Sequence, residues 1–151
     1  MLTDFLTDDL VKLDVEASTP EEAIQTVGNL LVSAEKILPE YIDDMIQTFH
    51  NLGPYIVLSP GIAMPHSKPS NHVKEPCIAF CRLKKAIEFH HPTNDPVKFL
   101  FALAGNDEIG HLNLLKGLCS FLMNEENVKK LYTIQKEKEL IELIRKEEGK
   151  Q

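Results

Sequence analysis

Apolar residues in the first third of the chain recur every three or four positions, which is the spacing of a helix packed on one side. The first such set is Ile24, Val27, Leu31, Ala34 and Leu38. The segment Thr19-Pro20-Glu21-Glu22 before it favours a helix start, because its threonine can cap and its second glutamate can complete a capping box. We expect Pro39 to break this helix. A second helix should end at Gly53-Pro54, with Ile42, Met45, Ile46, Phe49 and Leu52 on its apolar face.

The middle of the chain consists of short apolar runs separated by proline, glycine and asparagine, a pattern typical of strands. The predicted strands cover residues 10–15, 55–58, 62–64, 76–83 and 97–104. The last one is apolar without alternation from Phe99 to Ala104, as expected for a strand that helices cover on both faces.

Two further helices complete the predicted elements. One begins near His111, and its inner face consists of Leu114, Leu115, Leu118, Phe121 and Leu122. The other lies in the charged C-terminal segment and buries Leu140, Ile141, Leu143 and Ile144. This order of helices, strands and helices predicts one α/β domain spanning residues 1–151, with helices on both faces of the sheet.

Composition narrows the class of protein further. A chain of 151 residues, 43% hydrophobic and 26% charged, is typical of one soluble globular domain. No apolar run approaches the roughly 20 residues that span a bilayer. The acidic N-terminus does not resemble a signal peptide, so we expect a cytoplasmic protein without direct membrane insertion. The net charge of −7 disfavours nucleic acid and anionic lipid and suits a basic protein partner.

The cysteines Cys77, Cys81 and Cys119 are interpreted as reduced core residues, because an odd count without a CxxC pair argues against disulfides and zinc. The first two lie four residues apart in an apolar stretch, which would put both thiols on one face of a strand.

The segment of residues 59–69, SPGIAMPHSKP, contains the main candidate for chemistry. Three prolines and a glycine restrict the backbone around His66, which indicates that the position of a side chain matters there. Histidine is a nucleophile near neutral pH, because one ring nitrogen is unprotonated while an acceptor can hold the other. From the residues alone, an ordinary loop histidine remains the alternative.

A second candidate segment, Gly105 to His111, connects the buried strand to the third helix. If the preceding strands are parallel, His66 and His111 emerge at the same edge of the sheet. The free N–H groups and positive dipole end of a helix start favour a phosphoryl group there. Lys68 could add a cation against the phosphoryl oxygens. Taken alone, His111 is a polar residue of a helix start and Lys68 a solvated lysine.

Residues 60–66, PGIAMPH, closely resemble the signature of the mannitol/fructose-type (type 2) enzyme IIA domains of the bacterial sugar phosphotransferase system. The resemblance covers residues 19–145 and implies a small mixed sheet of about five strands flanked by helices on both faces. It implies that the histidine phosphocarrier protein HPr phosphorylates His66, which passes the phosphoryl group to a IIB component. It also implies that His111 positions the phosphorylated ring, that no cofactor is needed, and that a membrane IIC transporter is an indirect partner.

Within this family, the chain looks most like the ascorbate-type IIA proteins. The residues that carry this likeness are the run GPYIVLSPG at 53–61, Ser67-Lys68-Pro69, and Asn94-Asp95-Pro96-Val97. The chain departs from mannitol-type members, which have an arginine on the helix before the active-site strand. Here Gln47 to His50 occupy that region and no arginine precedes Arg82. Either Lys68 takes over the charge role or backbone amides alone hold the phosphoryl group.

Two other functions remain as alternatives to phosphoryl transfer. A regulatory IIA-like module would use the same chemistry at His66 without feeding a transporter. A metal site could use His66, His72, His90 or His91, and His111, although their spacing matches no zinc pattern. We expect His90 and His91 in an exposed turn and His50 at the end of the second helix, where the dipole favours a cation. An apolar rim around the crevice, with Met64 and Ile109 as candidates, should dock the protein partners.

Overall fold

A five-stranded sheet runs through the middle of the protein, which is described for residues 1–149 by a computed structural model. Its strands are β1 (Val11–Val15), β2 (Val57–Ser59), β3 (Ile62–Ala63), β4 (Cys77–Ile87) and β5 (Val97–Ala104), in the order β1-β4-β5-β3-β2. Strand β1 is parallel to β4 and β3 is parallel to β5, while β4 and β5, and β2 and β3, are antiparallel. The predicted mixed sheet is therefore confirmed.

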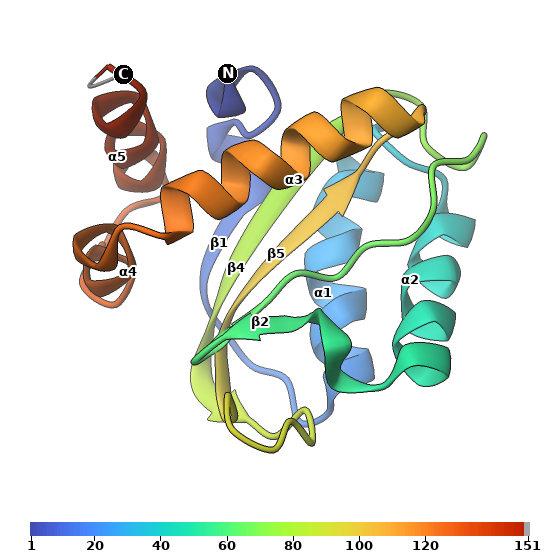
Figure 1. Cartoon of the computed structure of the whole chain (residues 1–151), viewed down its shortest axis with the longest axis horizontal. Helices are drawn as coiled ribbons and strands as arrows, with labels where there is room; N and C mark the ends of the chain where they lie inside the picture. Colours follow the sequence, from blue (N-terminus) through green and yellow to red (C-terminus); the bar gives the residue numbers. More distant parts are fainter. Residues whose placement is uncertain (150–151) are drawn as a thin grey trace.

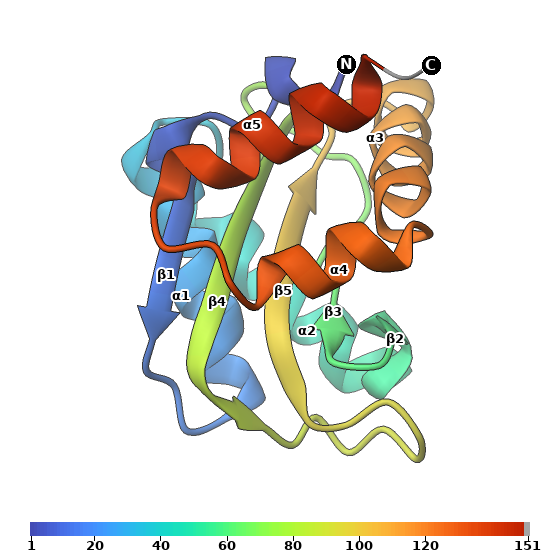
Figure 2. The same cartoon turned by 90° about the vertical axis from the view of Figure 1, so that its left-hand side faces the viewer.

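Helices cover both faces of this sheet, as predicted. The helices are α1 (Pro20–Ser33), α2 (Pro39–Leu52), α3 (Glu108–Leu122), α4 (Glu125–Leu131) and α5 (Glu137–Glu148). Short 3₁₀ turns occupy Leu2–Asp4, Asp8–Leu10 and Pro54–Ile56. Figures 1 and 2 show α1 and α2 on one face and α3, α4 and α5 on the other. Within residues 1–149, none of the helices has the length and apolar character that crossing a bilayer requires.

The core lies on both sides of the two longest strands. Every residue of β5 except Lys98 is buried, as its unbroken apolar run predicted. The ring of Phe80 on β4 lies 4.8 Å from that of Phe101 and 6.0 Å from that of Phe99, measured between centroids. Burying large aromatic side chains contributes much of the hydrophobic stabilisation of a domain of this size.

The parallel pairing of β3 with β5 decides where the candidate residues meet. Both strands point toward the same edge of the sheet, so the segment after β3 and the segment after β5 leave side by side. His66 continues the pairing through an isolated parallel bridge with Leu103, and the N–H of Leu103 donates to the carbonyl of Pro65 at 3.0 Å. The conditional prediction of parallel strands is confirmed.

Several predicted boundaries were wrong. The first helix ends at Ser33, and Pro39 begins α2 instead of breaking α1. Proline suits the first turn of a helix, where its missing N–H has no intrahelical partner to lose. Residues 54–56 form a 3₁₀ turn, so β2 begins at Val57 and not at residue 55 as predicted. Strand β4 continues beyond its predicted end at residue 83 to Ile87. The short helix α4, capped by Asn124, was not predicted.

The cysteine prediction is confirmed for two residues and wrong for the third. Cys77 and Cys81 are buried on β4, and burial raises the pKa of each thiol to about 12, so both stay protonated and unreactive. Cys119 is exposed, because α3 turns Leu114 and Leu118 toward the core and leaves Cys119 on its outer side.

Candidate phosphoryl-transfer site

The backbone around His66 is anchored on both sides. Pro65 is held by the N–H of Leu103, as described above. The N–H of Ser67 donates to the hydroxyl oxygen of Tyr41 at 2.9 Å, and this hydroxyl lies 2.9 Å from the carbonyl oxygen of Leu103, to which it donates. Tyr41 belongs to α2 and is fully buried, so it joins that helix, the His66 segment and the end of β5.

A single hydrogen bond determines which ring nitrogen of neutral His66 carries the proton. Its Nδ1 atom lies 2.7 Å from the carbonyl oxygen of Met64. A carbonyl can only accept, so Nδ1 carries the proton of the neutral ring. The lone pair is then on Nε2, and His66 is ready to act as a nucleophile through that atom.

His111 faces His66 from the first turn of α3. The helix begins at Glu108, and its N-cap residue Asp107 accepts a hydrogen bond from the N–H of Gly110 at 2.6 Å. The ring centroids of His111 and His66 lie 5.6 Å apart. Gly105 permits this approach, because a Cβ there would lie 2.8 Å from the Cβ of His111.

The protonation of His111 follows from its surroundings. Its Nδ1 is buried without a hydrogen-bond partner among the described residues. Nδ1 lacks a partner in either neutral tautomer, and the tautomer with its proton on Nε2 lets the ring donate a hydrogen bond in the cavity that His111 lines. Burial, and to a lesser extent the neighbouring His66, lowers the pKa of His111, which keeps the ring neutral near pH 7.

These side chains meet in one cavity of about 480 Å³. It is lined by Thr48, Asn51, Leu52, His66, Ser67, Lys68, Pro69 and His111. All three residues singled out from the sequence, His66, His111 and Lys68, therefore line it. Lys68 is exposed and forms no ion pair with any residue in the described range 1–149.

The sequence did not single out the α2 side of this cavity. Thr48 and Asn51 are three residues apart and so share one face of the helix. Thr48 belongs to the segment in which an arginine was expected, and its hydroxyl lies 3.0 Å from that of Ser67. Polar residues at helical spacing beside the buried set of α2 were the available signal.

A scan against known families identifies the type of protein. The model of the phosphoenolpyruvate-dependent sugar phosphotransferase system, EIIA 2, matches residues 4–147. The chain belongs to this family. It is a IIA component, a phosphotransferase that carries a phosphoryl group, and the resemblance inferred from residues 60–66 is confirmed.

Curated relatives and solved structures agree with this family. The ascorbate-specific EIIA components of Shigella boydii and Escherichia coli K12 are 36% and 35% identical over 135 residues, covering 89% of this chain and 88% of each relative. The mannitol-specific cryptic enzyme IIA of Escherichia coli has 30% identity and a TM-score of 0.83, covering 95% of this chain and 97% of that chain. The match in the Escherichia coli complex of mannitol enzyme IIA with phosphorylated enzyme IIB has 26% identity and a TM-score of 0.79. It covers 91% of this chain and 94% of that chain.

The other histidines of this IIA protein lie outside the cavity lining. His72 bonds through Nδ1 to a carboxylate oxygen of Asp44 at 2.7 Å, and His50, in the last turn of α2, lies 3.1 Å from Glu21. His90 is exposed, and Nδ1 of His91 accepts two backbone N–H groups within its turn. No group of three or more His, Cys, Asp or Glu side chains within residues 1–149 is arranged to hold a metal ion.

Around the cavity, the predicted apolar rim needs one correction. Met64 is completely buried, because its strand-like segment packs into the core, so it cannot dock a partner. Ile109 is 76% exposed, as a docking residue must be. Leu52 on α2 and Leu112 on α3 are also exposed large apolar side chains, and Leu52 lines the cavity itself.

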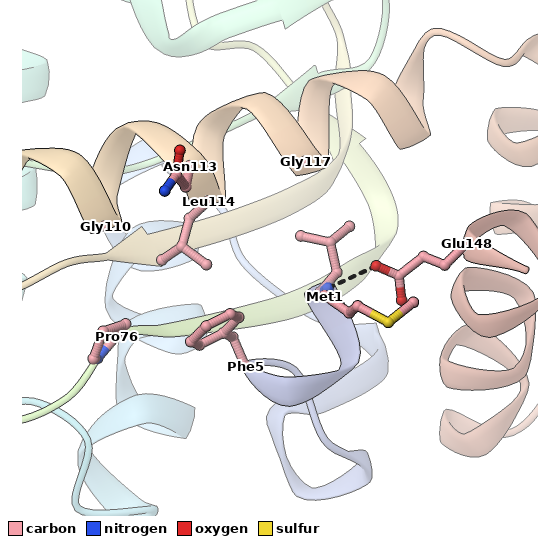
Figure 3. Close-up of a pocket in the computed structure, with 9 residues that line it drawn as sticks. Met1, Phe5, Pro76, Gly110, Asn113, Leu114, Gly117 and Glu148 are labelled. Atoms are coloured by element: carbon pink, nitrogen blue, oxygen red, sulfur yellow. Dashed lines mark hydrogen bonds between the residues drawn. The ribbon is translucent and has the colours of Figure 1, made fainter. Parts of the chain in front are cut away.

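A second cavity, of about 260 Å³, lies where the N-terminal turn meets α3 and α5 (Figure 3). The carboxylate of Glu148 on its wall accepts the N–H of Leu2 at 2.8 Å, the bond dashed in Figure 3. Its other lining residues are Met1, Phe5, Pro76, Gly110, Asn113, Leu114 and Gly117. Among residues 1–149, no histidine, cysteine or lysine lines this second cavity, so the described wall lacks the groups that phosphoryl transfer needs.

Proposed function

We propose that this IIA protein accepts a phosphoryl group from phosphorylated HPr on Nε2 of His66 and passes it to a IIB component. The observation that carries the proposal is the hydrogen bond from Nδ1 of His66 to the carbonyl of Met64. It leaves Nε2 as the unprotonated nitrogen on a side chain that lines an open cavity.

The reaction is an in-line displacement at phosphorus. The Nε2 lone pair of His66 forms the new N–P bond while the N–P bond to the donor imidazole breaks, and the donor nitrogen keeps the electron pair. In the transfer to IIB, a nucleophile of IIB attacks phosphorus while the N–P bond to His66 breaks, and Nε2 of His66 keeps the electron pair. Catalysis then comes chiefly from positioning and charge stabilisation.

His111 and Lys68 complete the proposed site. The Nε2–H of neutral His111 donates to a phosphoryl oxygen, and the exposed ammonium of Lys68 offsets the charge of the phosphoryl group. The exposed Ile109, Leu52 and Leu112 form the apolar docking rim, since carrier encounters must be small and short-lived. No cofactor takes part in the proposed step.

The proposed route leads to sugar uptake. The IIB partner is supported by the structural similarity to a IIA protein solved together with phosphorylated IIB, and a membrane IIC transporter would be reached through IIB. An ascorbate-like substrate is supported by relatives that are named ascorbate-specific, which also favours transport over a regulatory role. We propose that residues 1–151 act as a single IIA domain in the cytoplasm, where the donor phosphoenolpyruvate is found.

The test is phosphorylation of the purified chain by phosphoenolpyruvate, enzyme I and HPr. Wild-type protein should gain one acid-labile phosphoryl group, mapped to His66 by mass spectrometry. His66→Ala should take up none while keeping its far-ultraviolet circular dichroism. His50→Ala is the matched control, because His50 lies outside the cavity lining, and it should label normally. Labelling of the His66→Ala variant would contradict the proposal.

A further inference from the structure

Two hydroxyl groups face each other beside His66 and have no role in the function proposed above. Oγ1 of Thr48, from α2, and Oγ of Ser67, the residue after His66, lie 3.0 Å apart. Both side chains are half-buried, and both line the cavity that contains His66 and His111.

The hydroxyl pair has one more donor proton than its own hydrogen bond uses. Each hydroxyl has one proton to donate, and the bond between them uses only one of the two. Neither hydroxyl has another hydrogen-bond partner among the described residues. One O–H donor is therefore left over in the cavity wall, whichever of the two residues donates to the other.

The wall of the His66 cavity offers few positive charges to a phosphoryl dianion. Lys68 is the only lysine or arginine among the described residues of the lining, and His111 stays neutral because its pKa is lowered. The first arginine of the chain, Arg82, is buried and paired with Asp14 at 3.2 Å. A dianion held by one exposed lysine needs additional neutral donors, and hydrogen bonds to a charged group are stronger than those between neutral groups.

The position of the pair is fixed before any phosphoryl group arrives. The N–H of Ser67 is held by the buried hydroxyl of Tyr41, and Thr48 lies on α2, the same helix as Tyr41. A donor that is already oriented costs no reorganisation when charge develops near it. Asn51, one turn after Thr48, adds an amide NH₂ to the same wall, because its Oδ1 is the atom bonded to Gln47.

We propose that the Thr48–Ser67 hydroxyl pair donates a hydrogen bond to the oxygens of the phosphoryl group on His66. The pair substitutes for a guanidinium on α2 and neither gains nor loses a proton during transfer. This inference rests on the proposed function of His66.

The experiment compares initial rates of phosphoryl uptake from phosphorylated HPr. The main variant is Thr48→Val/Ser67→Ala, which keeps the shape of Thr48 and removes both hydroxyls. Thr26→Val is the matched control, because Thr26 is also a half-buried helical threonine, but its hydroxyl bonds to Glu22 within α1. Thr48→Ser keeps the hydroxyl and loses only the methyl group.

The double variant should be roughly ten- to a hundredfold slower, the loss expected for a hydrogen bond to a charged group. Each single variant should fall between it and wild type, because the remaining hydroxyl keeps a proton to donate. Thr26→Val should transfer at the wild-type rate, and Thr48→Ser, which keeps the hydroxyl, should be faster than Thr48→Val. A fast double variant beside an unlabelled His66→Ala variant overturns the hydroxyl-pair inference and leaves the proposed function intact. Labelled His66→Ala overturns the proposed function itself.

A second measurement covers the case in which the double variant folds poorly. The ³¹P chemical shift of the phosphohistidine should move in Ser67→Ala and Thr48→Val relative to Thr26→Val, because a hydrogen bond to the phosphoryl oxygens is lost or rearranged. Identical shifts in all three variants would show that neither hydroxyl touches the phosphoryl group.

Discussion

Individual histidines of this IIA protein acquire their acid–base properties from partners that are distant in sequence. His111 and His72 are both partly buried, yet their surroundings shift the pKa in opposite directions. Burial, followed by the His66 ring, lowers the pKa of His111. The hydrogen-bonded carboxylate of Asp44 raises the pKa of His72. Residue type alone sets neither value.

We expect the two rings to titrate on opposite sides of the ordinary histidine value of 6.5. Ring ¹H–¹⁵N spectra recorded from pH 4 to 9 would follow each one separately. Asp44→Asn should return His72 toward 6.5 and leave His111 unchanged. A His111 midpoint at or above that of His72 would contradict the burial argument.

The pKa shifts of His111 and His72 make the free energy of unfolding depend on pH in opposite directions. Between its lowered pKa and 6.5, His111 is more protonated in the unfolded chain than in the native one. Its contribution to the free energy of unfolding is therefore lost as the pH falls through that window. The contribution of His72 is present below 6.5 and is lost as the pH rises through its raised pKa.

At the level of elements, the start of α3 brings the second histidine to the site. Asp107 caps the helix, and Gly105, the residue directly after β5, lies against His111 in the first turn. Any side chain at Gly105 meets the Cβ and Cα of His111 within 3 Å, and these atoms belong to a packed helix that cannot simply turn away. The junction therefore tolerates only glycine without displacing α3.

Gly105→Ala should reduce the free energy of unfolding by about 1–3 kcal/mol, the usual cost of overpacking. The displaced His111 should also slow phosphoryl uptake. Urea denaturation and the uptake assay measure the two effects. Gly149→Ala, whose added Cβ would make ordinary contacts at the end of α5, is the control and should change neither. A Gly105→Ala protein with wild-type values of both would show that the junction can relax.

Across the whole molecule, one buried arginine joins the sheet to its C-terminal helices. Nη1 of Arg82, on β4, donates to the carbonyls of Leu131 and Ile134 at 3.0 and 2.7 Å. The other side of the guanidinium reaches Asp14 on β1. Arg82 thus links β1, β4 and the connection between α4 and α5, and none of these partners lines the His66 cavity.

Arg82→Leu should lower the free energy of unfolding by about 2–4 kcal/mol, because it leaves two carbonyl groups without their donor. Phosphoryl uptake should be unchanged at temperatures where the variant is folded. Thermal denaturation and the uptake assay separate the two quantities. Loss of uptake in a fully folded variant would mean that the link also positions the site.

Local sequence determined much of this protein. The apolar run of β5, the capping residues of α1 and the four buried residues of α5 each fixed an element, because neighbouring side chains and backbone preferences decide such segments. The restricted backbone at residues 59–69 and the signature around His66 led to the correct family before any contact was known.

Tertiary structure alone decided what surrounds those residues. The parallel pairing of β3 with β5, two strands separated by β4 in the chain, brings His66 to His111. Packing of α2 against the His66 segment adds Thr48, while Met64 is turned into the core and Cys119 away from it. Such contacts join residues far apart in sequence, and the spacing within one segment carries no information about which other segment will cover it.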